Sequence, residues 1–193
     1  MGKGRQDVTC IAGLAEGGTV WMAGDSAGIS GWDLTVRADP KVFVNGPYVI
    51  GYAGSFRGGQ LLNYAFSPPV PDDGNLHGFM CTAFTDALRT CLKDGGYAST
   101  DKDQEEGGTF LAGVHGRLFR IDTDYGVGES ADGFLAVGCG SEAARGALFA
   151  LADSGLDPVQ RLGKALAAAE RLSAGVRGPA TIARTPATGG SDG

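Results

Sequence analysis

Thr9, Asp25 and Lys41 follow one another at two equal intervals of 16 residues. Each lies at one end of a short segment whose composition predicts a β-strand. A threonine with a free α-amino group carries nucleophile and base on one residue, because an amine with a reference pKa of about 8 takes the hydroxyl proton near neutral pH. A neighbouring lysine disfavours protonation of that amine and stabilises negative charge on oxygen, and a carboxylate holds the lysine. The three residues therefore predict an N-terminal-nucleophile site.

Cys10, the residue after Thr9, is a second candidate nucleophile. Successive residues of a strand point to opposite faces of the sheet. Both intervals of 16 residues count from Thr9, so the sequence favours Thr9 over Cys10.

Gly24-Asp25-Ser26-Ala27-Gly28 also fits G-x-S-x-G, the motif that places a serine nucleophile at a strand-to-helix turn. Residues 29–38 carry no helical pattern, and His77 and His115 are the chain's two histidines. His115 lies in a predicted hairpin tip, which favours a surface histidine over the base of a serine triad.

Gly138-Cys139-Gly140 follows a predicted strand and opens a predicted helix, as a dinucleotide-binding turn does. Ala143 stands where that motif has its third glycine, so a tight structural turn is the favoured interpretation. The acidic residues between positions 97 and 107 leave a cation site open, although a solvated loop is the ordinary interpretation. These residues are Asp101, Asp103, Glu105 and Glu106.

In the first half of the chain, the elements that must position these residues are predicted to be strands. Residues 8–14 with 19–23, and 41–44 with 48–52, predict two hairpins because turn residues separate the members of each pair. A helical stripe then covers residues 79–92 and ends at Gly95-Gly96. The stripe consists of Phe79, Met80, Ala83, Phe84, Ala87, Leu88, Cys91 and Leu92.

The second half repeats this order of strands and then helices. Strands are predicted at 109–114, 117–121 and 134–137, a helix at 141–152, and a last strand at 180–183. Between them, Asp157-Pro158 supplies the N-cap and first-turn proline of another helix. Its buried face is predicted from Val159, Leu162, Ala165, Leu166, Ala169 and Leu172. Two sheets packed face to face, with helices outside, satisfy the whole order.

Composition bounds the class of protein. The chain has 193 residues, which suit one domain, and a formal net charge of −6, which argues against a nucleic-acid-binding module. It has no apolar run of about 20 residues for a membrane span and no apolar N-terminal signal. The four cysteines (Cys10, Cys81, Cys91 and Cys139) show no CxxC spacing, so neither a structural zinc site nor a disulfide scaffold is expected. A cytoplasmic protein is the expectation.

The two intervals and the order of elements resemble the β-type subunits of the proteasome and of its bacterial two-component relative, an ATP-dependent protease. The resemblance runs from about Val8 to Ala183. Residues 109–114 with 117–122 look like the family's central hairpin, and residues 134–141 like its Gly-Ser-Gly segment. The resemblance implies an α+β, four-layer αββα sandwich of two antiparallel sheets flanked by helices, which is the Ntn-hydrolase fold. It also implies ring oligomerisation and threonine-dependent peptide hydrolysis without a metal or organic cofactor.

The resemblance assigns roles to further residues. The Gly54 N–H donates a hydrogen bond to the oxyanion. Ser173 and Glu170 are supporting groups, and Cys139 takes the place of a serine that positions the nucleophile. Glu170-Arg171-Leu172-Ser173 resembles the family's Asp-x-x-Ser, with Glu in place of Asp and Ala174 in place of glycine. Ala27 and Ile29 replace the more usual Arg and Thr on the substrate-binding strand.

The resemblance also divides the chain. Residues 1–8 become a propeptide or N-terminal extension, 9–185 a single domain, and 186–193 a flexible tail. Val8 stands where self-processing subunits usually have glycine, and with Cys139 it favours one alternative: a non-catalytic ring or scaffold subunit that keeps residues 1–8. A hydrolase of non-peptide amides is a third possibility. The implied partners are a peptide or unfolded protein substrate, other copies of the chain in a homo-oligomeric ring, and an ATPase unfoldase.

Overall fold

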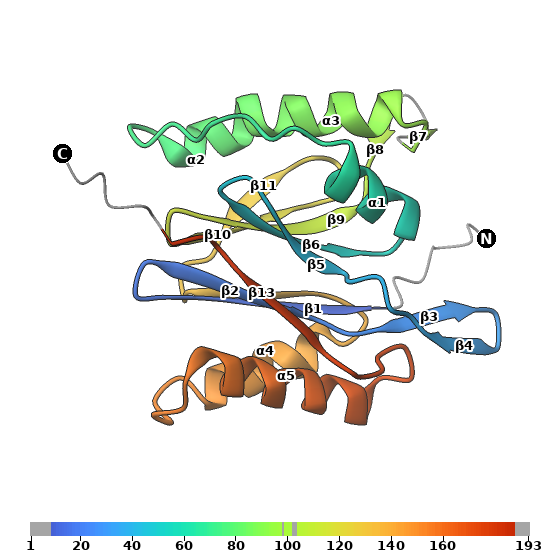
Figure 1. Ribbon diagram of the computed structural model, residues 1–193, viewed down its shortest axis with the longest axis vertical. Helices are drawn as coiled ribbons and strands as arrows, with labels where there is room; N and C mark the ends of the chain where they lie inside the picture. Colours follow the sequence, from blue (N-terminus) through green and yellow to red (C-terminus); the bar gives the residue numbers. More distant parts are fainter. Residues whose placement is uncertain (1–8, 98, 102–103, 188–193) are drawn as a thin grey trace.

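Two antiparallel sheets face each other at the centre of the protein (Figure 1). The structure, a computed structural model, describes residues 9–97, 99–101 and 104–187. One sheet has the strand order β12 (Phe134–Gly138), β1 (Cys10–Glu16), β2 (Thr19–Gly24) and β13 (Thr181–Arg184). The other has the order β11 (Val127–Glu129), β10 (Arg117–Ile121), β9 (Thr109–Val114), β6 (Tyr48–Ala53) and β5 (Val42–Asn45).

Helices cover the outer face of each sheet (Figure 1). α4 (Ser141–Ala150) and α5 (Pro158–Leu172) pack on the four-stranded sheet, and α1 (Phe56–Tyr64), α2 (Leu76–Phe79), a π-helical turn η1 (Met80–Phe84) and α3 (Thr85–Asp94) pack on the five-stranded sheet. Three apolar clusters fill the spaces between the four layers. The predicted four-layer αββα class is confirmed.

The helix over residues 79–92 contains a π-helical turn that the stripe did not reveal. Met80, Phe84, Leu88 and Leu92 are buried at steps of four residues, whereas Ala83 is exposed. The wider π turn rotates the residues around it relative to a regular helix, so the predicted burial of Ala83 is wrong.

The buried face of α5 differs from its prediction at both ends. Leu162, Ala165, Leu166 and Ala169 are buried, but Val159 is 41% and Leu172 77% exposed. Val159 and Leu172 lie in the first and last turns of the helix, so the stripe continues into turns that the described core does not cover. Arg161 is buried instead and pairs with Glu16 at the end of β1.

Five short strands, in three parts of the chain, were not predicted. β3 (Ala27–Ser30) and β4 (Asp33–Val36) form a hairpin that projects from the sandwich, with Trp32 fully exposed at its tip (Figure 1). β11 adds an edge strand beside β10. The predicted acidic loop holds a small hairpin of β7 (Ser99–Asp101) and β8 (Gln104–Glu106), while Asp103 lies outside the described residues.

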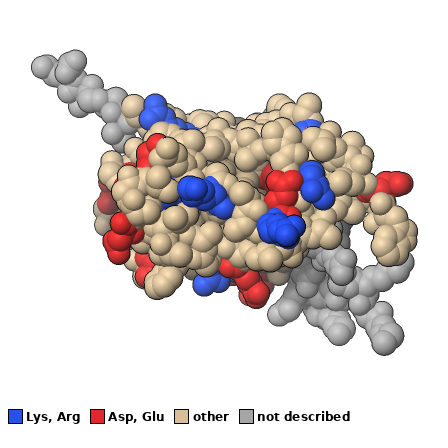
Figure 2. All heavy atoms as spheres, turned by 90° about the horizontal axis from the view of Figure 1, so that it is seen from below, with Lys and Arg blue, Asp and Glu red and all other residues tan. Residues whose placement is uncertain are grey.

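Surface charge is mixed on the face that α4 and α5 form, where basic and acidic side chains are interspersed (Figure 2). Within the described ranges, no helix combines the length and apolar character that a bilayer crossing requires. The predicted extension 1–8 and most of the predicted tail 186–193 lie outside the described residues.

Candidate active site

The three residues of the predicted nucleophile site lie at one end of the sandwich. Ile11 pairs with Gly24, so Thr9 and Asp25 leave β1 and β2 at the same end of the four-stranded sheet. Lys41 precedes β5 in the other sheet, where its carbonyl accepts a hydrogen bond from the Tyr52 N–H (3.2 Å). One sheet therefore supplies the threonine and the aspartate, and the facing sheet supplies the lysine.

Gly24 allows the two sheets to approach each other at this end. A Cβ atom on Gly24 would lie 2.9 Å from Ile11 Cδ1, 3.1 Å from Val42 Cγ1 and 3.3 Å from Lys41 Cβ. Such distances leave no room for a methyl group without displacement of a neighbour. The glycine thus lets the start of β5, and with it Lys41, lie against the end of β2.

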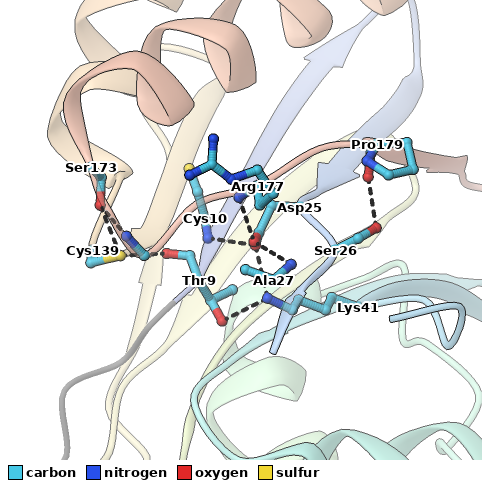
Figure 3. A network of polar contacts seen from close by, with 11 residues as sticks. Thr9, Cys10, Asp25, Ser26, Ala27, Lys41, Cys139, Ser173, Arg177 and Pro179 are labelled. Atoms are coloured by element: carbon cyan, nitrogen blue, oxygen red, sulfur yellow. Dashed lines mark hydrogen bonds and ion pairs between the residues drawn. The ribbon is translucent and has the colours of Figure 1, made fainter. Parts of the chain in front are cut away.

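The Lys41 amine bridges the other two side chains (Figure 3). Its Nζ lies 2.9 Å from Asp25 Oδ1 and 3.1 Å from Thr9 Oγ1. All three residues are at most 2% exposed. Burial lowers the pKa of Lys41, although the Asp25 carboxylate opposes that shift. The arrangement places a cation directly beside the hydroxyl oxygen of Thr9.

Four hydrogen bonds fix the Asp25 carboxylate. Oδ1 accepts from Lys41 Nζ and from the Cys10 N–H (2.9 Å), and Oδ2 accepts from the N–H groups of Ala27 (2.9 Å) and Arg177 (3.3 Å). Sequence reasoning missed Ala27 and Arg177, because a backbone donor has no signature in residue type. With all four donors in place, the carboxylate holds Lys41 in one position.

The turn from β12 to α4 holds the backbone of Thr9. Cys139 Sγ and the Gly140 N–H each donate to the Thr9 carbonyl at 3.5 Å, and Ser173 Oγ donates to Cys139 Sγ at 3.1 Å. Gly138 has a φ of 91°, and a Cβ there would lie 2.2 Å from the Thr9 oxygen. The Gly138-Cys139-Gly140 motif is therefore the close structural turn that the sequence favoured, and it packs against the candidate nucleophile.

Glu170 and Gly54 lie further from the cluster. Glu170 pairs with the side chain of Arg177 (3.4 Å), whose own N–H contacts Asp25. Gly54 follows β6 with a φ of 106°, two residues after Tyr52, which pairs with Lys41. Strand register thus places Gly54 at the same end of the sandwich as the other residues.

The two rival nucleophiles are placed unfavourably. Cys10 is fully buried in the core under α4 and α5, and burial, with the nearby Asp25 charge, raises the pKa of its thiol to about 12. Ser26 is followed by strand β3 and not by a helix, so the G-x-S-x-G segment is no nucleophile elbow. Its hydroxyl donates to the Pro179 carbonyl at 2.7 Å.

Known proteins resemble this chain in structure. No family model matches the sequence, and no curated protein does. The structure matches that of BPH from Thiobacillus denitrificans, which was also solved in complex with epoxomicin, with a TM-score of 0.76 and 20% identity over 92% of this chain and 97–98% of that one.

Two further matches agree with the first. Eukaryotic HslV from Trypanosoma brucei has a TM-score of 0.67 and 24% identity, with 91% of this chain and 98% of that one covered. Anbu (ancestral beta-subunit) from Yersinia bercovieri has a TM-score of 0.62 and 14% identity, with 92% and 82% covered. The chain therefore has the fold of the HslV-like, proteasome-type peptidases, the Ntn-hydrolase fold that the resemblance implied.

Proposed function

We propose that this chain is the peptidase subunit of a proteasome-like, self-compartmentalising protease, with Thr9 as its N-terminal nucleophile after removal of residues 1–8. One observation carries the proposal: a buried lysine donates to both the Thr9 hydroxyl and a buried aspartate. A mere ion pair between strand ends requires no threonine at 3.1 Å. The fold supports the proposal, because its solved neighbours are proteasome-type peptidases.

The chemistry starts once Thr9 has a free α-amino group. That amine takes the hydroxyl proton, and Oγ1 attacks the carbonyl carbon of a peptide bond. Lys41 stabilises negative charge on the attacking oxygen and disfavours protonation of the amine, while Asp25 holds Lys41 in position. The Gly54 N–H is the proposed donor to the oxyanion.

Collapse of the tetrahedral intermediate expels the amine half of the peptide, which takes the proton held by the Thr9 amine. The remaining acyl group is esterified to Oγ1. Water, deprotonated by the same amine, then attacks the ester and releases the second product with Thr9 restored. No step requires a metal or organic cofactor.

We further propose a ring of identical subunits in the cytoplasm, with an ATPase that unfolds protein substrates. The ring and the ATPase are suggested by the likeness to HslV and proteasome-type structures, and the location carries over the expectation from the sequence. Val8 precedes the cleavage point. N-terminal sequencing of the purified protein tests whether the bond between Val8 and Thr9 is cleaved.

A panel of fluorogenic peptides tests the activity. The wild-type protein should hydrolyse some members, Thr9→Ala should lose at least about a hundredfold in rate, and Thr19→Ala, a matched change at the start of β2, should stay near wild type. Epoxomicin, the ligand of the Thiobacillus structure, should form an adduct that depends on Thr9.

Other outcomes favour the alternatives. A full-length chain inert to all peptides and to epoxomicin indicates a non-catalytic ring subunit. Thr9-dependent activity confined to small amides indicates a hydrolase of another substrate class.

A further inference from the structure

Ser26 has a role that its motif did not predict. The residue is 5% exposed and directly follows Asp25. Its Oγ donates to the Pro179 carbonyl at 2.7 Å (Figure 3). Its N–H donates to the Arg177 carbonyl at 2.8 Å. Ser26 therefore holds the segment between α5 and β13 at two points.

Those two points lie on the C-terminal side of the N–H that serves the candidate active site. The Arg177 N–H donates to Asp25 Oδ2 at 3.3 Å, the longest of the four hydrogen bonds to that carboxylate. A hydrogen bond of this length is sensitive to small movements of its donor. The position of residues 177–179 thus decides whether Asp25 keeps its fourth donor.

The side-chain ion pair of this segment is a weaker tether than the Ser26 hydroxyl. The ion pair between Arg177 and Glu170 joins side chains that are 45% and 37% exposed, at 3.4 Å. Exposed ion pairs contribute little, because solvent screens them. The part-buried hydroxyl of Ser26 makes a short hydrogen bond that water competes for less, and its loss leaves a carbonyl without that donor.

We infer that Ser26 is a positioning residue of the candidate active site. Its hydroxyl holds the 177–179 segment so that the Arg177 N–H stays on Asp25, which in turn holds Lys41 beside Thr9. The Ser26 hydroxyl donates to the Pro179 carbonyl and not to Thr9 Oγ1, so its proposed effect on catalysis is indirect. The effect of Ser26 on catalysis rests on the proposed function, whereas its effect on residues 177–179 does not.

Ser26→Ala, Ser26→Thr and Ser154→Ala test the inference. Ser154 is the matched control, because its Oγ also donates to a carbonyl at 2.7 Å, on the surface after α4. Ser26→Ala should lower kcat for peptide hydrolysis about tenfold with KM unchanged. Ser26→Thr, which keeps the hydroxyl, and Ser154→Ala should stay within about twofold of wild type.

Amide hydrogen exchange gives a readout without substrate. Ser26→Ala should speed exchange of the amides of residues 174–178 at least about tenfold over Ser154→Ala. If Ser26→Ala does not fold, Ser26→Cys replaces it, since a thiol is a weaker donor. Unchanged exchange, a change in KM alone, or equal damage from Ser26→Thr overturns the inference. A wild-type protein without peptidase activity overturns the proposed function instead and leaves the exchange test standing.

Discussion

Lys41 Nζ lies 3.1 Å from Thr9 Oγ1, although the two residues flank strands of different sheets. The contact therefore depends on how closely the sheets pack at this end and not on any local turn. Because Asp25 binds the same amine from the end of β2, a change in either sheet should alter the position of the Lys41 amine relative to the Thr9 hydroxyl oxygen.

Lys41→Met should remove the activity and also weaken the fold. The variant leaves Asp25 buried without its ion-pair partner, which should lower the free energy of unfolding by about 3–5 kcal/mol. Peptide hydrolysis should fall at least about a hundredfold, because the cation beside Thr9 is gone. Urea denaturation and steady-state kinetics measure the two effects.

The double variant Lys41→Met/Asp25→Asn separates these effects. Neutralising Asp25 should restore much of the lost stability, since no unpaired charge then stays buried, while activity stays lost. Recovery of activity in the double variant would show that Lys41 has only a structural role.

Gly24→Ala should impair catalysis through packing alone. The new methyl group meets Ile11, Val42 and the Cβ of Lys41 at 2.9–3.3 Å, so the start of β5 must move. We expect a fall in kcat of at least about tenfold and a loss of about 1–3 kcal/mol in the free energy of unfolding. Gly146→Ala in α4 is the control, because no described atom beyond its chain neighbours and its own helix backbone lies within 4 Å of the added Cβ. Equal activity of the two variants would contradict this account of Gly24.

Stability above pH 9 should report on Cys10. The unfolded thiol ionises around its ordinary pKa of 9.0, whereas burial raises the folded pKa to about 12. The folded state therefore binds the thiol proton more tightly than the unfolded state does. The stability that the protonated thiol contributes is lost as the pH rises from the unfolded pKa towards the folded pKa. Relative to Cys10→Ala, the wild-type free energy of unfolding should fall by about 2 kcal/mol from pH 8 to 10.5.

The difference in the free energy of unfolding between the wild-type protein and Cys10→Ala isolates the contribution of the Cys10 thiol. Burial also raises the pKa of Tyr48 and Tyr52, but both proteins carry these residues. Parallel stability curves for the two proteins would show that the Cys10 thiol titrates normally.

Alkylation of Cys139 should block the candidate active site. This thiol is exposed and contacts both the Thr9 carbonyl and Ser173, so an added carbamidomethyl group must displace one of them. Iodoacetamide should inhibit the wild-type protein and Cys81→Ser, whose missing thiol is exposed elsewhere, but not Cys139→Ser. Inhibition of all three proteins alike would place the sensitive thiol elsewhere.

The sequence predicted most of the fold because its strands and helices carry strong local patterns. The strands at 109–114 and 117–121 were predicted to the residue, with His115 at the tip between them in a left-handed conformation (φ 47°). The β3–β4 hairpin was missed because its strands have four residues each and are mostly exposed or half-buried, so burial imposes no strong pattern on them. Val159 and Leu172 were misplaced because periodicity does not show where the sheet beneath a helix ends.

The sequence indicated the side chains of the candidate site but not the backbone groups that hold them. The intervals from Thr9 to Asp25 and Lys41 indicated the cluster, and the structure brings those three into contact. The roles of Arg177 and Ser26 came from backbone hydrogen bonds between segments far apart in sequence. Such contacts follow from tertiary packing and leave no pattern in residue type.

N-terminal sequencing of the purified, assembled protein, together with its intact mass, tests the central claim most directly. If Thr9 is the nucleophile, the wild-type protein should begin at Thr9 with a mass lower by residues 1–8, and Thr9→Ala should keep the full-length chain. A wild-type assembly that still begins at Met1 or Gly2 contradicts this claim, because the Thr9 nitrogen then stays in a peptide bond and provides no base.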